Sequence, residues 1–207
     1  MQNEAHGTSL GPGPARSKAT STEPPVCSRV SVIDLETGGL DPSTDPILQV
    51  AVVHASIVGR YGIEITDEWC TTVRLDRPWR RYGARHIHGI RRHRLLLAPS
   101  IGSTMQRLVD RCESRLIVAH NMAFDWSFIL SASDRTGIPP PAGDRLCTLE
   151  LSRSLDPGRT VSHRLTDIAR RLGIEHEHAH DALGDARTTA LVLPRLLAAR
   201  DCADQDR

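Results

Sequence analysis

The sequence predicts an α/β domain built on a mixed sheet. Two β-branched, apolar segments, 29–39 and 47–58, follow one another near the start of the folded region. Further along, a short apolar segment at 115–120 lies between segments with helical spacing. Because strands come first in succession and are then mixed with helices, we expect one sheet with helices packed against it.

The composition is that of one ordinary globular domain. Of the 207 residues, 39% are apolar, 25% are charged and only 3% are aromatic, so aliphatic side chains must fill the core. The formal net charge of +1 indicates neither a nucleic-acid binder nor a membrane binder. Five scattered cysteines without C-x-x-C spacing suggest neither a zinc ribbon nor a disulfide framework. No apolar run approaches membrane-spanning length, so we expect a cytoplasmic protein with no membrane partner.

Three segments are expected along the chain. Residues 1–28 are rich in Gly, Pro, Ser and Thr and cannot bury enough apolar surface to offset chain entropy, which predicts a disordered tail. Residues 29–200 should form the folded domain, and 201–207 a short polar C-terminal tail.

Glycines, turn residues and helix caps place the elements within the domain. The pair Gly38–Gly39 ends the first strand. Ser100 is a candidate N-cap, Gly137 and Gly173 close two helices, and Pro194 should kink or end the last one. The expected strands are 29–39, 47–58, 68–75 and 115–120, with a turn at 40–46, and the expected helices are 100–112, 121–137, 163–173 and 181–200.

Two acids stand at the end of the first strand. Asp34 and Glu36 are two residues apart, so strand alternation puts both on the face that also carries Val30 and Val32. Adjacent carboxylates repel one another unless a divalent cation neutralises them. The alternative is a strand that simply runs into a polar turn.

A third acid, Asp125, lies in a strongly apolar helical segment. Placing a carboxylate one turn inside such a helix costs free energy unless it is exposed or paired with a cation. The alternative interpretations are that Asp125 faces solvent and that the nearby Asn121 is only the helix N-cap.

The segment 175–186, "EHEHAHDALGDA", adds a histidine and a fourth acid. On one continuous helix His180 and Asp185 would lie about 140° apart. We therefore place His180 on the loop before the helix, Asp181 at its cap and Asp185 one turn inside. A mobile histidine beside a fixed acid suits a general base beside a metal ligand.

The rival interpretation of this segment is a metal clamp made by His176, His178 and His180. In an extended chain these side chains would share one face. No second ligand cluster with zinc-like spacing lies nearby, which disfavours a dedicated zinc or nickel site.

Together, three blocks resemble the DEDDh family of 3′→5′ exonucleases, most closely the epsilon-type proofreading exonuclease of DNA polymerase III. The blocks are "VIDLETGGLDP", "AHNMAFDWSFIL" and "HDALGDA", supported by weaker echoes in "IHGI" and "HRLTDIARRLGI". The resemblance spans residues 29–197. It implies a ribonuclease-H-like fold, with a five-stranded mixed sheet flanked by helices.

The resemblance also implies a two-metal mechanism with Mg²⁺ or Mn²⁺. Asp34 would bridge both ions, Glu36 and Asp185 would complete the shell of one, and Asp125 would help to hold the other. His180 would deprotonate the attacking water, and the product would be a nucleoside 5′-monophosphate. Oxygen ligands suit these hard cations better than zinc.

Substrate positions follow from the same blocks. Thr37 and Leu40 match positions that grip the terminal nucleotide, Leu40 by wedging against its base, and Asn121 and Phe124 match positions that line the same pocket. The alternatives are that Phe124 belongs to the core and that Leu40 only closes the turn. The sequence departs from the family at Gly38, where a second threonine is common.

The partner implied by the resemblance is the 3′ end of single-stranded DNA. The segment 79–94 holds six arginines and no acids, so it either contacts the phosphate backbone or forms a solvated face. The short chain after the last helix favours a stand-alone enzyme, or transient recruitment by a polymerase or repair partner. The alternatives are an RNA-directed exoribonuclease of the same family and a nucleic-acid-binding adaptor with weak catalysis.

Overall fold

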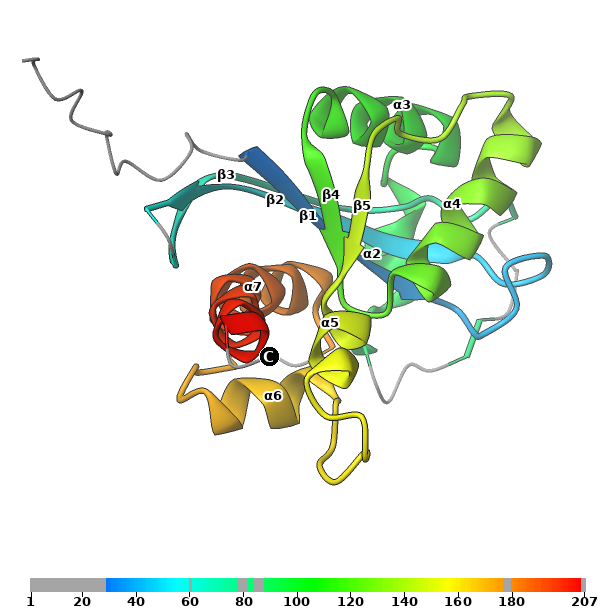
Figure 1. The fold of residues 1–207 in the computed structure, drawn as a ribbon. Coiled ribbons are helices and arrows are strands. Elements are labelled where there is room, and N and C mark those ends of the chain that lie inside the picture. Colours follow the sequence, from blue (N-terminus) through cyan, green and yellow to red (C-terminus); the bar gives the residue numbers. More distant parts are fainter. Residues whose placement is uncertain (1–28, 60, 78–81, 84–87, 177–179, 206–207) are drawn as a thin grey trace, which may run out of the picture.

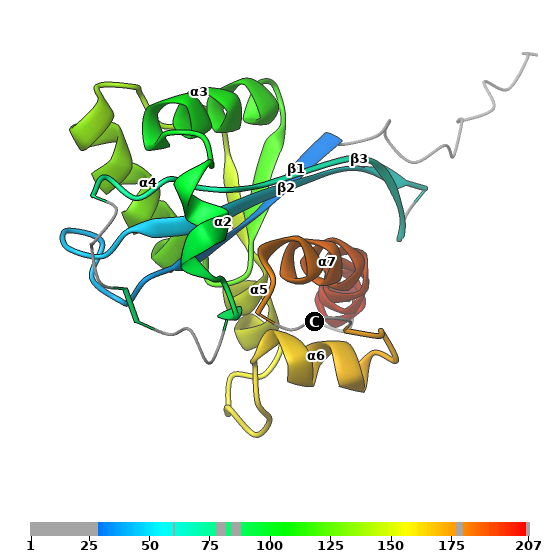
Figure 2. The same cartoon turned by 180° about the vertical axis from the view of Figure 1, so that it is seen from behind.

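The computed structural model describes residues 29–59, 61–77, 82–83, 88–176 and 180–205. The expected tail 1–28 and His178 lie outside these residues, as does most of the first half of the arginine-rich segment 79–94. The model places a five-stranded sheet between two groups of helices (Figure 1, and from behind in Figure 2).

The sheet has the strand order β3-β2-β1-β4-β5. Its strands are β1 (Arg29–Thr37), β2 (Ile47–Val58), β3 (Gly62–Thr72), β4 (Leu116–Ala119) and β5 (Arg145–Cys147). The β1–β2 and β2–β3 pairs are antiparallel, whereas the β1–β4 and β4–β5 pairs are parallel. The expected mixed, five-stranded sheet is therefore confirmed.

Helices cover both faces of this sheet. On one face lie α3 (Ile101–Cys112) and α4 (Met122–Thr136), and on the other lies the long α7 (Ala182–Gln205), with α5 (Thr148–Ser154) and α6 (Leu165–Arg171) packed beside it. The short α2 (Arg92–Leu96) lies near the antiparallel edge.

Successive side chains of β1 point to opposite faces of the sheet, so each face offers different residues to the helices packed on it. Ile33 and Leu35 join the core beneath α3 and α4. Val30 and Val32 turn the other way and pack against α7, whose contacting residues include Ala182, Ala186 and Ala190. Small side chains at this four-residue spacing let the helix approach the sheet closely. The face of β1 that carries Val30 and Val32 also carries Asp34 and Glu36, so the acids point toward the start of α7.

Several boundaries differ from the sequence prediction. The third strand begins at Gly62 rather than Glu68, and the sequence did not indicate β5, α2 or α5. The last helix does not end at Pro194 but continues to Gln205, so it includes most of the expected tail 201–207. Its backbone loses only one hydrogen bond at a proline, and packing of α7 on the sheet compensates for it.

The predicted caps are confirmed where the structure describes them. The Ser100 side chain accepts a hydrogen bond from the backbone N–H of Ser103 at 3.2 Å, as an N-cap does. Gly137 and Gly173 follow α4 and α6 with φ values of 72° and 68°, the left-handed conformation that glycine adopts without strain.

Candidate active site

Three carboxylates converge where β1 ends beside the first turn of α7. Asp34, Glu36 and Asp185 each offer an oxygen atom, and these atoms lie within 4.8 Å of one another. All three side chains are half-buried. Because the sheet and α7 bring together residues about 150 positions apart, the convergence depends on the fold and not on local sequence.

The electrostatics of this cluster are those of acids without a counter-charge. Burial, followed by repulsion from Asp125, Asp185 and Glu36, raises the pKa of Asp34 well above its ordinary value. Burial and repulsion from Asp185 and Asp181 raise the pKa of Glu36 to about 7. A divalent cation would remove both costs, because it favours the charged form of every carboxylate around it.

Asp125 lies behind this cluster. It is 3% exposed, and its Oδ1 accepts a hydrogen bond of 3.1 Å from the backbone N–H of Leu35 on β1. Burial raises its pKa to about 8. The interpretation that Asp125 faces solvent is therefore wrong. The group of three oxygens within 4.8 Å does not include Asp125, but its charge acts on Asp34, so it lies close to the first carboxylate.

The start of α7 has the predicted arrangement. His180 stands before the helix with φ 68°, and Asp181 caps it by accepting from the backbone N–H of Gly184 at 3.4 Å. Gln49 on β2 donates to Asp181 at 3.0 Å and accepts from the backbone N–H of Ala182. The helix therefore begins at a fixed place on the sheet, with Asp185 one turn inside it.

His176 makes a contact that no sequence pattern indicated. Its Nε2 lies 2.5 Å from Oδ1 of Asp185, while the backbone N–H of His180 donates to Oδ2 of Asp185 at 3.3 Å. His176 therefore contacts an acid of the cluster, while the rival clamp also needs His178, which lies outside the described residues. Among the residues that the structure describes, the one group that could hold a metal contains no histidine, which further disfavours the rival interpretation.

The four positions matched to the terminal nucleotide are brought to the same end of the sheet. Thr37 is 8% exposed and donates to the Gly39 carbonyl at 2.7 Å, whereas Leu40 is 84% exposed. Asn121 occupies the N-cap position of α4 but has φ 69° and makes no side-chain cap bond, so it is not a conventional cap. Phe124 is half-buried against the core, with its ring centroid 5.1 Å from that of Phe128.

The departure at Gly38 has a steric reason. A Cβ atom there would lie 2.8 Å from Cδ of Pro46 and 2.8 Å from Cβ of Tyr82, closer than side chains pack. The Gly38 carbonyl also accepts from the backbone N–H of Gly83 at 2.7 Å. The described part of the arginine-rich segment thus packs directly against the first motif, and a threonine could not replace this glycine without displacing it.

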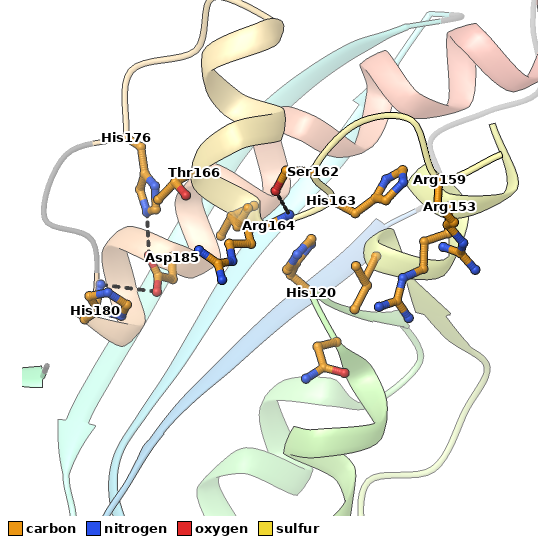
Figure 3. A pocket seen from close by; sticks show the side chains of 13 residues that line it. His120, Arg153, Arg159, Ser162, His163, Arg164, Thr166, His176, His180 and Asp185 are labelled. Atoms are coloured by element: carbon orange, nitrogen blue, oxygen red, sulfur yellow. Dashed lines mark hydrogen bonds and ion pairs between the residues drawn. The ribbon is translucent and has the colours of Figure 1, made fainter. Parts of the chain in front are cut away.

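A cavity of about 1040 Å³ opens beside Asp185 (Figure 3). Its lining includes His180, Asn121 and His120. The Nδ1 of His120 lies 3.0 Å from Oγ1 of Thr148, and burial lowers the pKa of His120 to about 4, so this ring is neutral at physiological pH. An open cavity therefore adjoins the acidic cluster.

Known proteins resemble this chain in sequence. The PolC-type DNA polymerase III of Thermotoga maritima is 33% identical over 171 residues, and that of Staphylococcus aureus is 29% identical over 168 residues. Each alignment covers 80% of this chain but only 12% and 11% of those polymerases. The chain thus spans about an eighth of the length of these relatives.

Solved structures share its fold. Escherichia coli exonuclease I in complex with a dT13 oligonucleotide superposes with a TM-score of 0.70 at 20% identity, covering 86% of this chain and 43% of that one. Exonuclease X in complex with 5′-overhanging duplex DNA gives a TM-score of 0.62 at 24% identity, covering 83% and 93%. These similarities confirm the predicted ribonuclease-H-like fold.

The family assignment rests on the match to a whole domain. The RNase_T family model, which describes an exonuclease, matches residues 31–193, a range that contains α4, most of β1 and the first half of α7 with their acids. This confirms the enzyme class that the three sequence blocks predict, an exonuclease of the DEDDh type. The chain belongs to the RNase_T exonuclease family.

Proposed function

We propose that the chain is a 3′→5′ exonuclease that hydrolyses single-stranded DNA ends to nucleoside 5′-monophosphates. The observation that carries this proposal is the meeting of Asp34, Glu36 and Asp185 within 4.8 Å, with His180 on the adjoining loop. The polymerase relatives and the DNA-bound structural neighbours favour DNA as the substrate. Stand-alone action or transient recruitment in repair or proofreading fits this activity.

The donor set fits two divalent cations, Mg²⁺ or Mn²⁺. Carboxylate oxygens are the ligands these hard cations prefer, and the raised pKa of Glu36 indicates a site that lacks positive charge. Asp34, Glu36 and Asp185 would hold one ion, and Asp125 would help Asp34 to hold the second. When bound, such ions lower the pKa of water and offset the negative charge that develops on a phosphodiester during hydrolysis.

His180 is the residue we assign to the proton transfer. Its ring makes no hydrogen bond to a described residue, while its backbone N–H is fixed on Asp185. The ring can therefore turn toward a water molecule without leaving the acidic cluster. A neutral imidazole accepts a proton near neutral pH, which suits a general base.

The terminal nucleotide would be held on the side of the cluster formed by β1 and α4. Leu40 is 84% exposed, which leaves its side chain free to wedge against a base. The Phe124 ring is half-buried and offers an aromatic face close to the start of α4. Thr37 and Asn121 complete this pocket, in which stacking would contribute about 1–3 kcal/mol per base.

The test is a gel time course on 5′-labelled single-stranded DNA and RNA of matched sequence, with Mg²⁺, Mn²⁺ or EDTA. We expect DNA to shorten from its 3′ end only when metal is present, and Asp34→Ala to abolish the ladder. His180→Gln should lower kcat by about 10²–10⁴-fold without weakening metal binding.

Each alternative gives its own result in this assay. A faster ladder on RNA would assign the chain to the exoribonucleases. The absence of a ladder on either strand, with the protein folded, would reject catalysis and favour an adaptor. Full activity in Asp34→Ala would reject the metal assignment.

A further inference from the structure

The cavity beside the acidic cluster has a basic end that the proposed catalysis does not use. It lies between α5, the start of α6 and the start of α7. Its volume of about 1040 Å³ is at the upper end of the range of about 300–1,000 Å³ typical of ligand pockets. Figure 3 shows Asp185 toward one end and Arg153 and Arg159 at the other, with Arg164 and His120 between them.

Three arginines give this cavity its charge. Arg153 comes from α5, Arg159 from the loop after it, and Arg164 from the residue before α6. All three are exposed. None of their guanidinium groups makes a hydrogen bond or ion pair with a described residue. Among the described residues that line the cavity, Asp185 is the one carboxylate, so the lining of the far end is basic.

Some arginines elsewhere on the described surface pair with acids. Arg111 lies 2.6 Å from Asp67, and Arg187 pairs with Glu68. On α6, next to the cavity, Asp167 forms its ion pair with Arg170 at 2.9 Å. The positive charge of Arg164 helps to lower the pKa of Asp167, but Arg164 makes no ion pair with it. Like charges gathered without paired acids repel one another, and an anion placed among them relieves that repulsion.

Contacts of His163 fix the segment between α5 and α6 that carries Arg159 and Arg164. The His163 side chain is 8% exposed, with Nδ1 2.9 Å from Oγ of Ser152 and Nε2 3.3 Å from Oδ2 of Asp156. These contacts tie the loop after α5 back to that helix. Nδ1 of His163 is thus engaged by Ser152 and the ring is buried, whereas the arginines are the exposed basic groups of the cavity.

We propose that this cavity binds backbone phosphates of the substrate strand other than the scissile phosphate. The proposal rests on the function proposed above, which puts the scissile phosphate at Asp34, Glu36 and Asp185. A phosphate at the far end of the cavity must belong to another nucleotide of the same strand. The planar guanidinium group presents paired N–H donors that match phosphate oxygens, so three arginines without an ion pair to a described residue suit this ligand.

The test compares substrates that differ in how many phosphates they carry. The proteins are the wild type, the triple variant Arg153→Gln/Arg159→Gln/Arg164→Gln, and the control Arg107→Gln. Arg107 is an exposed arginine on α3, across the sheet from the cavity, so its substitution removes the same kind of charge at a distance. Each protein is assayed with a deoxydinucleotide and a deoxydecanucleotide over a range of salt concentrations.

On the decanucleotide, the triple variant should raise KM by about tenfold or more. Its salt dependence should weaken by about 0.7 in log–log slope for each phosphate that no longer meets an arginine. On the dinucleotide, whose single phosphate is the scissile one, KM should change by less than about twofold. Arg107→Gln should change neither value.

Two results would overturn the proposal. An unchanged decanucleotide KM and salt slope in the triple variant would leave the arginines without a ligand. An equal rise in KM on both substrates would assign them to the scissile or product phosphate.

If the wild type degraded neither substrate, the proposed function would fail, and fluorescence anisotropy of a labelled decanucleotide in EDTA would decide about the cavity. Weaker binding by the triple variant than by Arg107→Gln would support the proposal, and equal binding would reject it.

Discussion

Acids at two places on the same sheet have opposite electrostatics. At the end of β1, burial and mutual repulsion raise the pKa of Asp34 and bring that of Glu36 to about 7. On β3, hydrogen bonds from Arg111 and Arg187 hold the pKa values of Asp67 and Glu68 below their ordinary range. One region has gathered acids without cations, and the other has matched Asp67 and Glu68 to arginines.

The first turn and a half of α7 contributes a residue to each region. Asp185 joins the unmatched acids, whereas Arg187, two residues later, reaches Glu68. An arginine therefore lies close to the acidic cluster in sequence, but it pairs with Glu68 and not with the cluster. Unpaired carboxylates cost stability in the metal-free protein, and a bound divalent cation recovers that cost. Acids left unpaired at the end of β1 are therefore the ones we propose for metal binding, whereas Asp67 and Glu68 stabilise the fold.

The largest expected effect comes from changing one acid of each region to its amide. Asp34→Asn should lower exonuclease activity by at least about 10³-fold, because it removes a charge that holds the metal. It should also raise the Tm measured in EDTA at pH 8, because it removes a repelled carboxylate. Steady-state kinetics measures the activity of Asp34→Asn, and calorimetry measures its Tm.

Asp67→Asn is the matched control. It should leave activity unchanged and lower Tm slightly, because Asp67 accepts from Arg111. Equal effects of the two substitutions on activity would remove the distinction between the regions.

The second prediction concerns pH and metal removal. The folded-state pKa values of Glu36 and Asp125 are raised from 4.5 and 3.8 to about 7 and about 8. A raised folded pKa means that the folded state holds its proton more tightly than the unfolded state. The protonation of Glu36 and Asp125 therefore stabilises the folded state at low pH, and this stabilisation is lost as pH rises toward 8.

In EDTA, the free energy of unfolding should thus fall between about pH 4 and pH 8, by several kcal/mol. With saturating Mg²⁺ the fall should disappear, because the metal binds the deprotonated acids. Urea unfolding at several pH values measures both curves. Parallel curves with and without Mg²⁺ would show that the cluster does not bind the ion.

The third prediction tests the matched region where it is most buried. The Arg111 side chain is 17% exposed, lies 2.6 Å from Asp67 and stacks 5.7 Å from the centre of the Trp69 ring. Arg111→Gln should lower the free energy of unfolding by about 1 kcal/mol, because it removes packing and a cation–π interaction. Chemical denaturation checks the size, and unchanged kcat confirms that the effect is structural.

The sequence predicted the acids of the site better than their surroundings. Strand alternation put Asp34 and Glu36 on one face, and the five-residue spacing from His180 put Asp185 inside the last helix. Both are local rules of geometry. The contact from His176 to Asp185 was missed, because it depends on the path of the loop before α7 and no periodicity encodes that path.

The arginines of the cavity and the ion pairs of β3 were missed for a related reason. Arg153 and Arg159 lie in a segment for which the sequence predicted no element, and their convergence depends on α5. The pairing of Glu68 with Arg187 joins residues far apart in the chain. A charge pattern that follows the sequence could not distinguish matched from unmatched arginines, because matching is decided by tertiary structure.

The smallest expected effect, Arg187→Gln, tests the boundary between the two regions. The arginine donates from Nε to Oε1 of Glu68 at 2.6 Å, but its side chain is 49% exposed. Water screens such a pair, so the free energy of unfolding should fall by about 0.5 kcal/mol, and by less at high salt.

The substitution also removes a positive charge two residues from Asp185, yet that charge is engaged by Glu68. Metal affinity, measured by Mn²⁺ titration calorimetry, should therefore change by less than about twofold. A larger loss of affinity would mean that Arg187 helps to balance the acidic cluster, and that the two regions are electrostatically one.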